Sequence, residues 1–391
     1  MSLNFEWDSG RRQGLIKSES LNQIREYFSV KNDAAKFARR FGGRFIPARK
    51  YTITPAGRFD VGLYKDILKF VTDNNVEDDI NYTDTFKQHI KPGYTKHIPL
   101  QLNLKLRDYQ EDIVNRCLKV GRGTVILATA GGKTLAMASL LESIYQQYDK
   151  NDFKAVIMVP DRGLVEQTYS DLKEYGVNFS ISKWTGDDDL DLSTSVIICN
   201  LGILQSSKSD TSWVHHVDLC IIDEVHKMRQ GNKINKIINK IHTPHRFGFT
   251  GTMPEELMDQ WNIIGKIGPV LYEKNSASLR EENYIAQVKA QIIDLKYETQ
   301  PKYILYPSEP LTPTKRYRRE IDFIINSNFR NNIISKLSEK FDKNSLILID
   351  YIEHGEILFD YIQQRCKDKK VYFIRGSVAV EDRDEIRPLM E

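Results

Sequence analysis

Apolar residues in the central part of the chain, about residues 100–285, recur in short runs that alternate with longer segments of helical period. The runs expected as strands are 124–127, 155–159, 196–199, 219–222 and 246–249, and the segments between them expected as helices include 134–148 and 163–175. Strands joined by crossover helices predict a doubly wound, mostly parallel α/β sheet. Ligands of such sheets bind at the carboxyl ends of the strands.

The first 75 residues show a different pattern and predict a small α+β module. A helix is expected over 20–30, a strand over 51–54, a turn over 55–57 and an amphipathic helix over 61–72. The acidic and polar residues that follow predict a linker over 76–99.

The last block, 286–391, begins another α/β unit. Apolar runs at 346–349 and 371–374 predict strands, and 353–362 predicts a helix between them. Because about 100 residues are few for a lobe of this kind, we expect this second lobe to be incomplete and the natural chain to continue past Glu391.

The composition indicates a globular chain, with 40% hydrophobic and 28% charged residues among 391. No apolar run approaches the ~20 residues of a membrane span, and the N-terminus lacks a signal peptide's apolar stretch, so a soluble, cytoplasmic protein is expected. Four scattered cysteines without a CxxC pair argue against structural zinc or a disulfide framework and are expected as buried thiols.

Charge is unevenly distributed although the net charge is only +3. The first 70 residues hold 14 Lys and Arg against 7 Asp and Glu, whereas the remaining 321 residues carry a net charge of −4. This asymmetry predicts a basic N-terminal module that contacts a polyanion.

The strongest chemical motif is TVILATAGGKT at 124–134, an apolar strand that enters a small, Gly-rich turn before a helix. Main-chain N–H groups of such a turn and the helix N-terminus favour phosphate oxygens. Lys133 is expected to reach the β- and γ-phosphates, and the Thr134 hydroxyl to bind Mg²⁺. Leu127 stands where the GxxxxGK[ST] pattern has glycine, which leaves a Gly-rich turn with a surface lysine as the alternative. The loop residues expected at the phosphates are Thr129, Ala130, Gly131 and Gly132.

A second motif, LCIIDEVH at 219–226, is an apolar strand that ends in two carboxylates and a histidine. Asp223 is expected to hold Mg²⁺, and Glu224 to polarise the water that attacks the γ-phosphate. Solvated acids at a strand end are the alternative for this pair taken alone.

With these motifs the chain resembles the superfamily 2 helicases of the DExD/H type, with DEVH as its box. The resemblance implies a RecA-like lobe in which LRDYQ at 106–110 contacts adenine through Arg107 and Gln110. It implies that TGT at 250–252, with His226, couples hydrolysis to strand movement; the coupling residues are His226, Thr250, Gly251 and Thr252. It also implies nucleic-acid contacts at Pro160, Arg162, Gln167, Gly186 and Asn200. The alternative for Gln167 and Asn200 is that they are simply polar surface residues.

More narrowly, the whole chain resembles the bacteriophage UvsW-type recombination and repair helicases. The likeness includes the N-terminal module, 327–334, 349–358 and 373–377. An arginine-finger motif of the QxxGRxxR kind is missing from the sequence. The resemblance implies that the nucleotide lies between two lobes.

Basic residues of the N-terminal module are expected to contact DNA phosphates, with neighbouring aromatics able to stack on bases. A place in the module's core is the alternative for these aromatics, Phe41, Phe45 and Tyr51. The basic residues are Arg39, Arg40, Arg44, Arg49 and Lys50.

The sequence thus predicts an ATP- and Mg²⁺-dependent DNA helicase or translocase for forked, branched or single-stranded DNA, bound mainly through the backbone. By the resemblance it would serve phage recombination, repair or replication, as a monomer in the host cytoplasm, with no membrane contact. The alternatives are a double-strand DNA translocase, an RNA helicase, and a branched-DNA binding protein whose ATPase is weak or regulatory.

Overall fold

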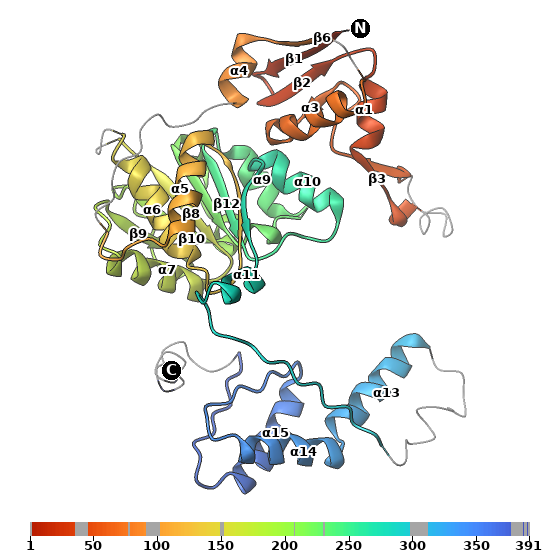
Figure 1. The fold of residues 1–391 in the computed structure, drawn as a ribbon, viewed down its shortest axis with the longest axis vertical. Coiled ribbons are helices and arrows are strands. Elements are labelled where there is room, and N and C mark those ends of the chain that lie inside the picture. Colours follow the sequence, from red (N-terminus) through yellow and green to blue (C-terminus); the bar gives the residue numbers. More distant parts are fainter. Residues whose placement is uncertain are drawn as a thin grey trace. The chain divides into compact units, whose positions relative to one another are not determined.

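The computed structural model describes residues 2–35, 46–76, 79–90, 102–148, 152–206, 208–229, 231–297, 312–376, 386 and 389. The chain divides into two units, Met1–Gln287 and Val288–Glu391. Figure 1 shows the N-terminal module and the large α/β lobe of the first unit, and the helices of the second.

The N-terminal module is built on a four-stranded sheet in the order β5-β2-β1-β6. Phe5 on β1 is fully buried and stacks on Phe86 with ring centroids 5.4 Å apart, so the sheet and its helices share one core. A separate two-stranded pair, β3-β4, lies beside it. The elements are β1 (Ser2–Asp8), β2 (Gln13–Lys17), α1 (Leu21–Tyr27), β3 (Ser29–Lys31), β4 (Arg49–Tyr51), β5 (Arg58–Phe59), η1 (Val61–Leu63), α3 (Tyr64–Asp73), β6 (Asp79–Tyr82) and α4 (Asp84–Ile90).

Three expectations for this module need correction. The first helix ends at Tyr27, because the chain turns there into β3. The strand expected at 51–54 is instead β4, which ends at Tyr51. The stretch expected as a linker contains β6 and α4 in its described part: β6 runs parallel to β1, and Phe86 of α4 is fully buried. β6 is an edge strand whose inward residues Ile80 and Tyr82 are only partly buried, so its short polar and apolar mixture did not predict a strand.

The large α/β lobe, which the helicase resemblance predicts to be a motor and which we call the motor lobe, is built on a seven-stranded sheet. Its order is β13-β7-β12-β11-β8-β10-β9, and its paired neighbours are all parallel. The five expected strands are confirmed to within one residue at each end. The sequence missed the two edge strands, β9 and β13. The strands are β7 (Gly123–Leu127), β8 (Ala155–Val159), β9 (Ile181–Trp184), β10 (Val196–Asn200), β11 (Leu219–Asp223), β12 (Arg246–Thr250) and β13 (Val270–Lys274).

Helices cover both faces of this sheet (Figure 1), because successive strand residues point to opposite sides. Ile157 and Ile221 face one core, with helices α5, α6, α7 and α11. Val156 and Ile222 face the other, with α8, α9 and α10. The helices are α5 (Asp108–Val120), α6 (Lys133–Tyr145), α7 (Arg162–Glu174), α8 (Leu201–Gln205), α9 (Lys233–Lys240), α10 (Leu257–Lys266) and α11 (Ser276–Glu281), with short 3-10 turns η2 (Ser212–His216) and η3 (Val225–Lys227). The doubly wound α/β fold is therefore confirmed.

The module is packed directly on the motor lobe through α10. Trp261 of α10 lies in the module's own core, 5.2 Å between ring centroids from Phe28. Lys266 donates a 2.9 Å hydrogen bond to the Asp60 carboxylate. Gly62 lies so close to the Ile264 carbonyl that a Cβ would clash with it. The first unit thus contains both parts.

The second unit contains helices α13 (Pro313–Ile325), α14 (Asn328–Lys340) and α15 (Ile352–Arg365). The helix expected at 353–362 is confirmed, but the strands expected at 346–349 and 371–374 are wrong: both segments lack strand pairing. Leu346 and Leu348 are 78% and 84% exposed, and Ile349 and Val371 pack on α15. An apolar run becomes a strand only when a neighbouring strand takes its main-chain hydrogen bonds.

The four cysteines are free and buried, as expected. Among the described residues, no helix combines the length and the apolar character needed to cross a bilayer.

Candidate nucleotide site and nucleic-acid contacts

The loop between β7 and α6 has the backbone of a phosphate-binding turn. Ala130 and Gly132 adopt left-handed conformations, with φ of 64° and 76°, and α6 begins at Lys133. Main-chain N–H groups in such a concave turn at a helix N-terminus favour an anion. Leu127, the departure from the glycine pattern, is buried beneath the loop, where its Cγ would lie 2.8 Å from a Cβ at Gly131. The leucine therefore fills the base of the turn and leaves its main chain in place.

Helix α5 holds this loop from one side. The buried Gln110 amide donates to the carbonyls of Gly131 (3.3 Å) and Gly132 (3.2 Å), and its oxygen accepts the Arg107 main-chain N–H at 2.9 Å. The Tyr109 hydroxyl also donates to the Gly131 carbonyl, at 2.8 Å, and accepts a hydrogen bond from the Arg107 guanidinium. Arg107 and Gln110 thus lie at the loop, while their adenine contact remains a prediction. The role of Tyr109 was missed because a tyrosine in an amphipathic helix is ordinarily a core residue.

The two acids of the DEVH box lie at the carboxyl end of β11. Glu224 adopts a left-handed conformation (φ 50°, ψ 48°), uncommon for a residue other than glycine, and its N–H donates to Asp223 Oδ1 at 2.9 Å. Lys133 Nζ lies 2.9 Å from Glu224 Oε1, with the lysine side chain only 12% exposed. The phosphate loop and the acidic box therefore meet in one site, although 91 residues separate these two side chains.

The surroundings of Asp223 shift the pKa of its carboxyl. Burial raises the pKa of its carboxyl above the ordinary value, with Lys133 opposing the shift and Glu224 adding to it. Strained backbone and a shifted carboxyl pKa in one place are typical of functional sites.

The predicted coupling residues also gather here. His226 Nδ1 lies 2.8 Å from Thr250 Oγ1 and 3.1 Å from Glu224 Oε2. Thr250 Oγ1 donates to the Thr252 carbonyl at 2.8 Å. A Cβ at Gly251 would lie 3.7 Å from Thr129 Oγ1 and 3.9 Å from Lys133 Nζ. Polar contacts thus connect the acidic box to the turn after β12.

The remaining lobe residues continue along the same sheet edge. Pro160, Gly186 and Asn200 lie at or just beyond the carboxyl ends of β8, β9 and β10, which are neighbours in the sheet. One half of the edge (β7, β12, β11) therefore holds the nucleotide candidates, and the other half (β8, β10, β9) the nucleic-acid candidates.

Within this second half, Arg162 and Gly186 are brought together. The Arg162 guanidinium pairs with Asp187 at 2.5 Å and lies against Gly186, where a Cβ would clash with it. Gln167 is exposed on α7, and Asn200 is the N-cap of α8. Their contacts with nucleic acid remain predictions.

Of the basic residues predicted to contact DNA in the N-terminal module, Arg49 and Lys50 lie on β4. Arg49 is held by Glu26 (3.2 Å) and by the Ser29 hydroxyl (2.8 Å), whereas Lys50 is exposed. Tyr51 donates to the Glu26 carboxylate at 2.6 Å. The other candidates, Arg39, Arg40, Arg44, Phe41 and Phe45, lie outside the described residues.

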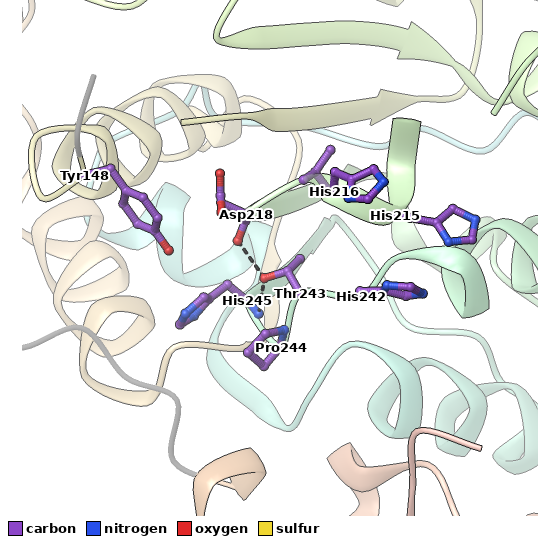
Figure 2. Close-up of a pocket in the computed structure, with 9 residues that line it drawn as sticks. Tyr148, His215, His216, Asp218, His242, Thr243, Pro244 and His245 are labelled. Atoms are coloured by element: carbon purple, nitrogen blue, oxygen red, sulfur yellow. Dashed lines mark hydrogen bonds between the residues drawn. The ribbon is translucent and has the colours of Figure 1, made fainter. Parts of the chain in front are cut away.

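A separate hollow of about 390 Å³ opens at the opposite edge of the sheet, where β11 and β12 begin. Figure 2 shows its histidines and the Thr243 hydroxyl donating to the Asp218 carbonyl at 2.6 Å. Because phosphate-binding turns follow strand carboxyl ends, this hollow is not the nucleotide site. It is lined by Tyr148, His215, His216, Val217, Asp218, His242, Thr243, Pro244 and His245.

The chain is similar to known proteins in sequence and in fold. Residues 103–255 match the family model of the type III restriction enzyme, res subunit. The ATP-dependent DNA helicase uvsW of Enterobacteria phage T4 is 24% identical over 395 aligned positions, which cover 96% of this chain and 75% of that protein. The putative DNA 3'-5' helicase Rad25 of Haloarcula marismortui is 25% identical over 270 positions, which cover 68% of this chain and 40% of that protein.

The crystal structure of UvsW from bacteriophage T4 has the same fold, with a TM-score of 0.56 and 20% identity over all of this chain and 78% of that one. The resemblance predicted from the motifs is thereby confirmed: the chain resembles the superfamily 2 helicases of the DExD/H type, the UvsW type among them.

Proposed function

We propose that this chain is an ATP-dependent DNA helicase or translocase that acts on forked or branched DNA. The observation that carries the proposal is the contact between Lys133 of the phosphate loop and Glu224 of the acidic box, at 2.9 Å. A lysine and a carboxylate at the carboxyl edge of one parallel sheet are the groups that triphosphate hydrolysis needs.

Each of these side chains has a task in hydrolysis that its environment supports. Lys133 would turn from Glu224 to the β- and γ-phosphates of bound ATP, since the phosphates carry more negative charge than one carboxylate. Glu224 would then be free to accept a hydrogen bond from the attacking water and to orient it. Its left-handed backbone aims the carboxylate towards Lys133 and not along the strand.

Mg²⁺ fits the oxygen donors present in this site. Asp223 Oδ1 accepts a hydrogen bond from the Glu224 N–H, whereas its Oδ2 accepts none among the described residues. Thr134, the second residue of α6, supplies a hydroxyl. Carboxylate and hydroxyl oxygens are the donors that Mg²⁺ prefers, and when bound it neutralises charge on the β- and γ-phosphates.

The preference for DNA is drawn from the T4 relative, which is named an ATP-dependent DNA helicase. The preference for forks and branches is drawn from the motif-based resemblance to the UvsW-type recombination and repair helicases. The candidate contacts Arg162, Gln167 and Asn200 would grip the backbone and so give little sequence specificity. We further propose that the protein works as a monomer in the cytoplasm of the phage host, which sedimentation and fractionation of infected cells would test.

The test is ATPase and unwinding activity with single-stranded, blunt duplex, forked and four-way DNA, and with RNA. We expect ATP hydrolysis stimulated by DNA, unwinding of forks before blunt duplexes, and loss of both activities in Lys133→Ala. Stimulation by RNA alone, or translocation along duplexes without fork preference, would contradict the proposal that forked or branched DNA is the substrate. DNA binding without stimulated hydrolysis would contradict the motor itself.

A further inference from the structure

The segment that follows the acidic box is unusually basic. From Val225 to His242 the chain has five Lys or Arg and no Asp or Glu, although acids make up 53 of its 391 residues. All five are exposed, and none belongs to the motifs already described. We call these residues the basic face; they are Lys227, Arg229, Lys233, Lys236 and Lys240.

Helix α9 orders three of these charges into one stripe. Ile234, Ile237 and Ile238 are buried against the sheet, which turns Lys233, Lys236 and Lys240 to solvent. Residues three and four apart lie on the same side of a helix. Among the described residues, Lys227, Arg229, Lys233 and Lys236 form no ion pair, so their charges are not neutralised within the protein.

The loop before α9 is fixed by buried amides. Asn262 donates to the Met228 carbonyl at 3.0 Å and to Asn235 Oδ1 at 3.0 Å, and Asn235 donates to the Arg229 carbonyl at 2.6 Å. Met228 itself is fully buried. Lys227 and Arg229 are therefore presented on an ordered main chain, which lowers the entropy lost when a ligand binds.

Positive charge continues beyond the helix. Lys240 donates to the Thr211 hydroxyl at 3.0 Å, beside the turn that carries His215 and His216. Arg12 of the N-terminal module donates to the His242 carbonyl at 3.0 Å. The hollow of Figure 2 thus lies at the end of the basic face. Asp210, close to Lys240, is an opposing charge there.

The chemistry of this face fits a phosphate backbone and not exposed bases. Single-strand sites add aromatic side chains on which bases stack, and the segment 225–242 has no Phe, Tyr or Trp. The stripe from Lys233 to Lys240 is about 10 Å long, a distance over which a duplex carries about six phosphate charges. A stiff row of cations without aromatics therefore suits duplex DNA.

We propose that the basic face binds the phosphate backbone of a duplex arm of the DNA substrate, apart from the contacts at the ends of β8, β10 and β9. This inference rests on the proposed function and adds a second DNA surface to it. The surface is joined closely to the hydrolytic site, since the Lys227 N–H donates to the Glu224 carbonyl at 3.0 Å.

The test compares the double variant Lys233→Gln, Lys236→Gln with a matched control, Lys119→Gln, Lys173→Gln, in the full chain. Both pairs are exposed helical lysines of the same lobe, but Lys119 and Lys173 lie on α5 and α7, across the sheet. Duplex and single-stranded DNA binding is measured as a function of salt, and folding is checked by thermal melting.

For the double variant we expect duplex binding to weaken roughly tenfold or more at about 0.1 M salt, with the slope of log affinity against log salt reduced by about 2. The DNA concentration for half-maximal ATPase stimulation should rise in parallel. Single-strand binding should stay as in the control. The variant Lys233→Arg, Lys236→Arg, which keeps both positive charges, should bind duplex DNA like the unmodified protein.

Two results would overturn the inference while leaving the proposed function intact: duplex binding like that of the control, or equal weakening for single strands and duplexes. An unmodified chain that binds no DNA would overturn both.

Discussion

The ion pair between Asp60 and Lys266 connects the N-terminal module to the motor lobe, and its loss should be costly. The Lys266 side chain is 10% exposed and the Asp60 side chain 28%, with 2.9 Å between Nζ and Oδ2. In Asp60→Ala the ammonium keeps only the Asn239 amide oxygen, also at 2.9 Å. Breaking a buried pair costs ~3–5 kcal/mol. Because Asp60 is partly exposed, we expect a loss near the lower limit, about 3 kcal/mol.

The neighbouring charges make removal of the acid worse than removal of the base. Arg246 lies near enough to contribute to the lowered pKa of Asp60. Burial lowers the pKa of Arg122, and the charge of Asp60 opposes that shift. Without the carboxylate, three cations share a buried site. Lys266→Met leaves Asp60 beside Arg246, so we expect a smaller loss for that variant.

The assay is urea unfolding of the full chain, followed by tryptophan fluorescence because Trp261 lies at this junction. The first unfolding transition of Asp60→Ala, Lys266→Met and the double variant is compared with that of the unmodified protein. The double variant should lose less than the sum of the single losses, by about 1–3 kcal/mol. Additive losses within about 0.5 kcal/mol would refute the buried pair.

Two further predictions concern acid and the phosphate loop. Although burial alone would raise it, Lys266 holds the pKa of Asp60 below its usual value, so the pair's stabilisation is complete above pH ~4 and disappears as the pH falls through the folded-state pKa. The stability difference between the unmodified protein and Asp60→Ala should therefore shrink below pH ~4 in urea titrations; a constant difference would contradict this sign. Gly132→Ala should weaken ATP binding about tenfold or more in calorimetry, because φ is 76° and the new Cβ clashes with the Gln110 amide. Gly231→Ala, where φ is 83° and no atom lies within 4 Å of the new Cβ, should bind ATP normally, and equal effects would contradict the role of the clash.

The central strands of the motor lobe were predictable because they are buried on both faces and read as continuous apolar runs. The edge strands β9 and β13 were not, since ISKW and VLYEK mix polar residues into short, half-exposed segments. β6 was missed for the same reason, because this short strand of mixed polarity lies in an acidic stretch. At 346–349 the error was the reverse: the run is apolar, but it has no strand pairing.

The motifs predicted which residues would meet at the sheet edge, because carboxyl ends of neighbouring parallel strands converge whatever lies between them in sequence. They could not predict what each side chain touches. The hydrogen bonds of Gln110 to the loop carbonyls depend on the placement of α5, and the Asp60–Lys266 pair joins residues 206 positions apart. The basic face could have been recognised in the sequence, because residues 225–242 contain no Asp or Glu.

The most direct test of the central claim is the ATPase activity of Glu224→Gln, measured with and without DNA beside its affinity for ATP. If Glu224 orients the attacking water, kcat should fall roughly 10²–10⁴-fold while ATP still binds through Lys133 and the loop. A purified Glu224→Gln protein that binds ATP and hydrolyses it at a near-normal rate would contradict the role of this carboxylate.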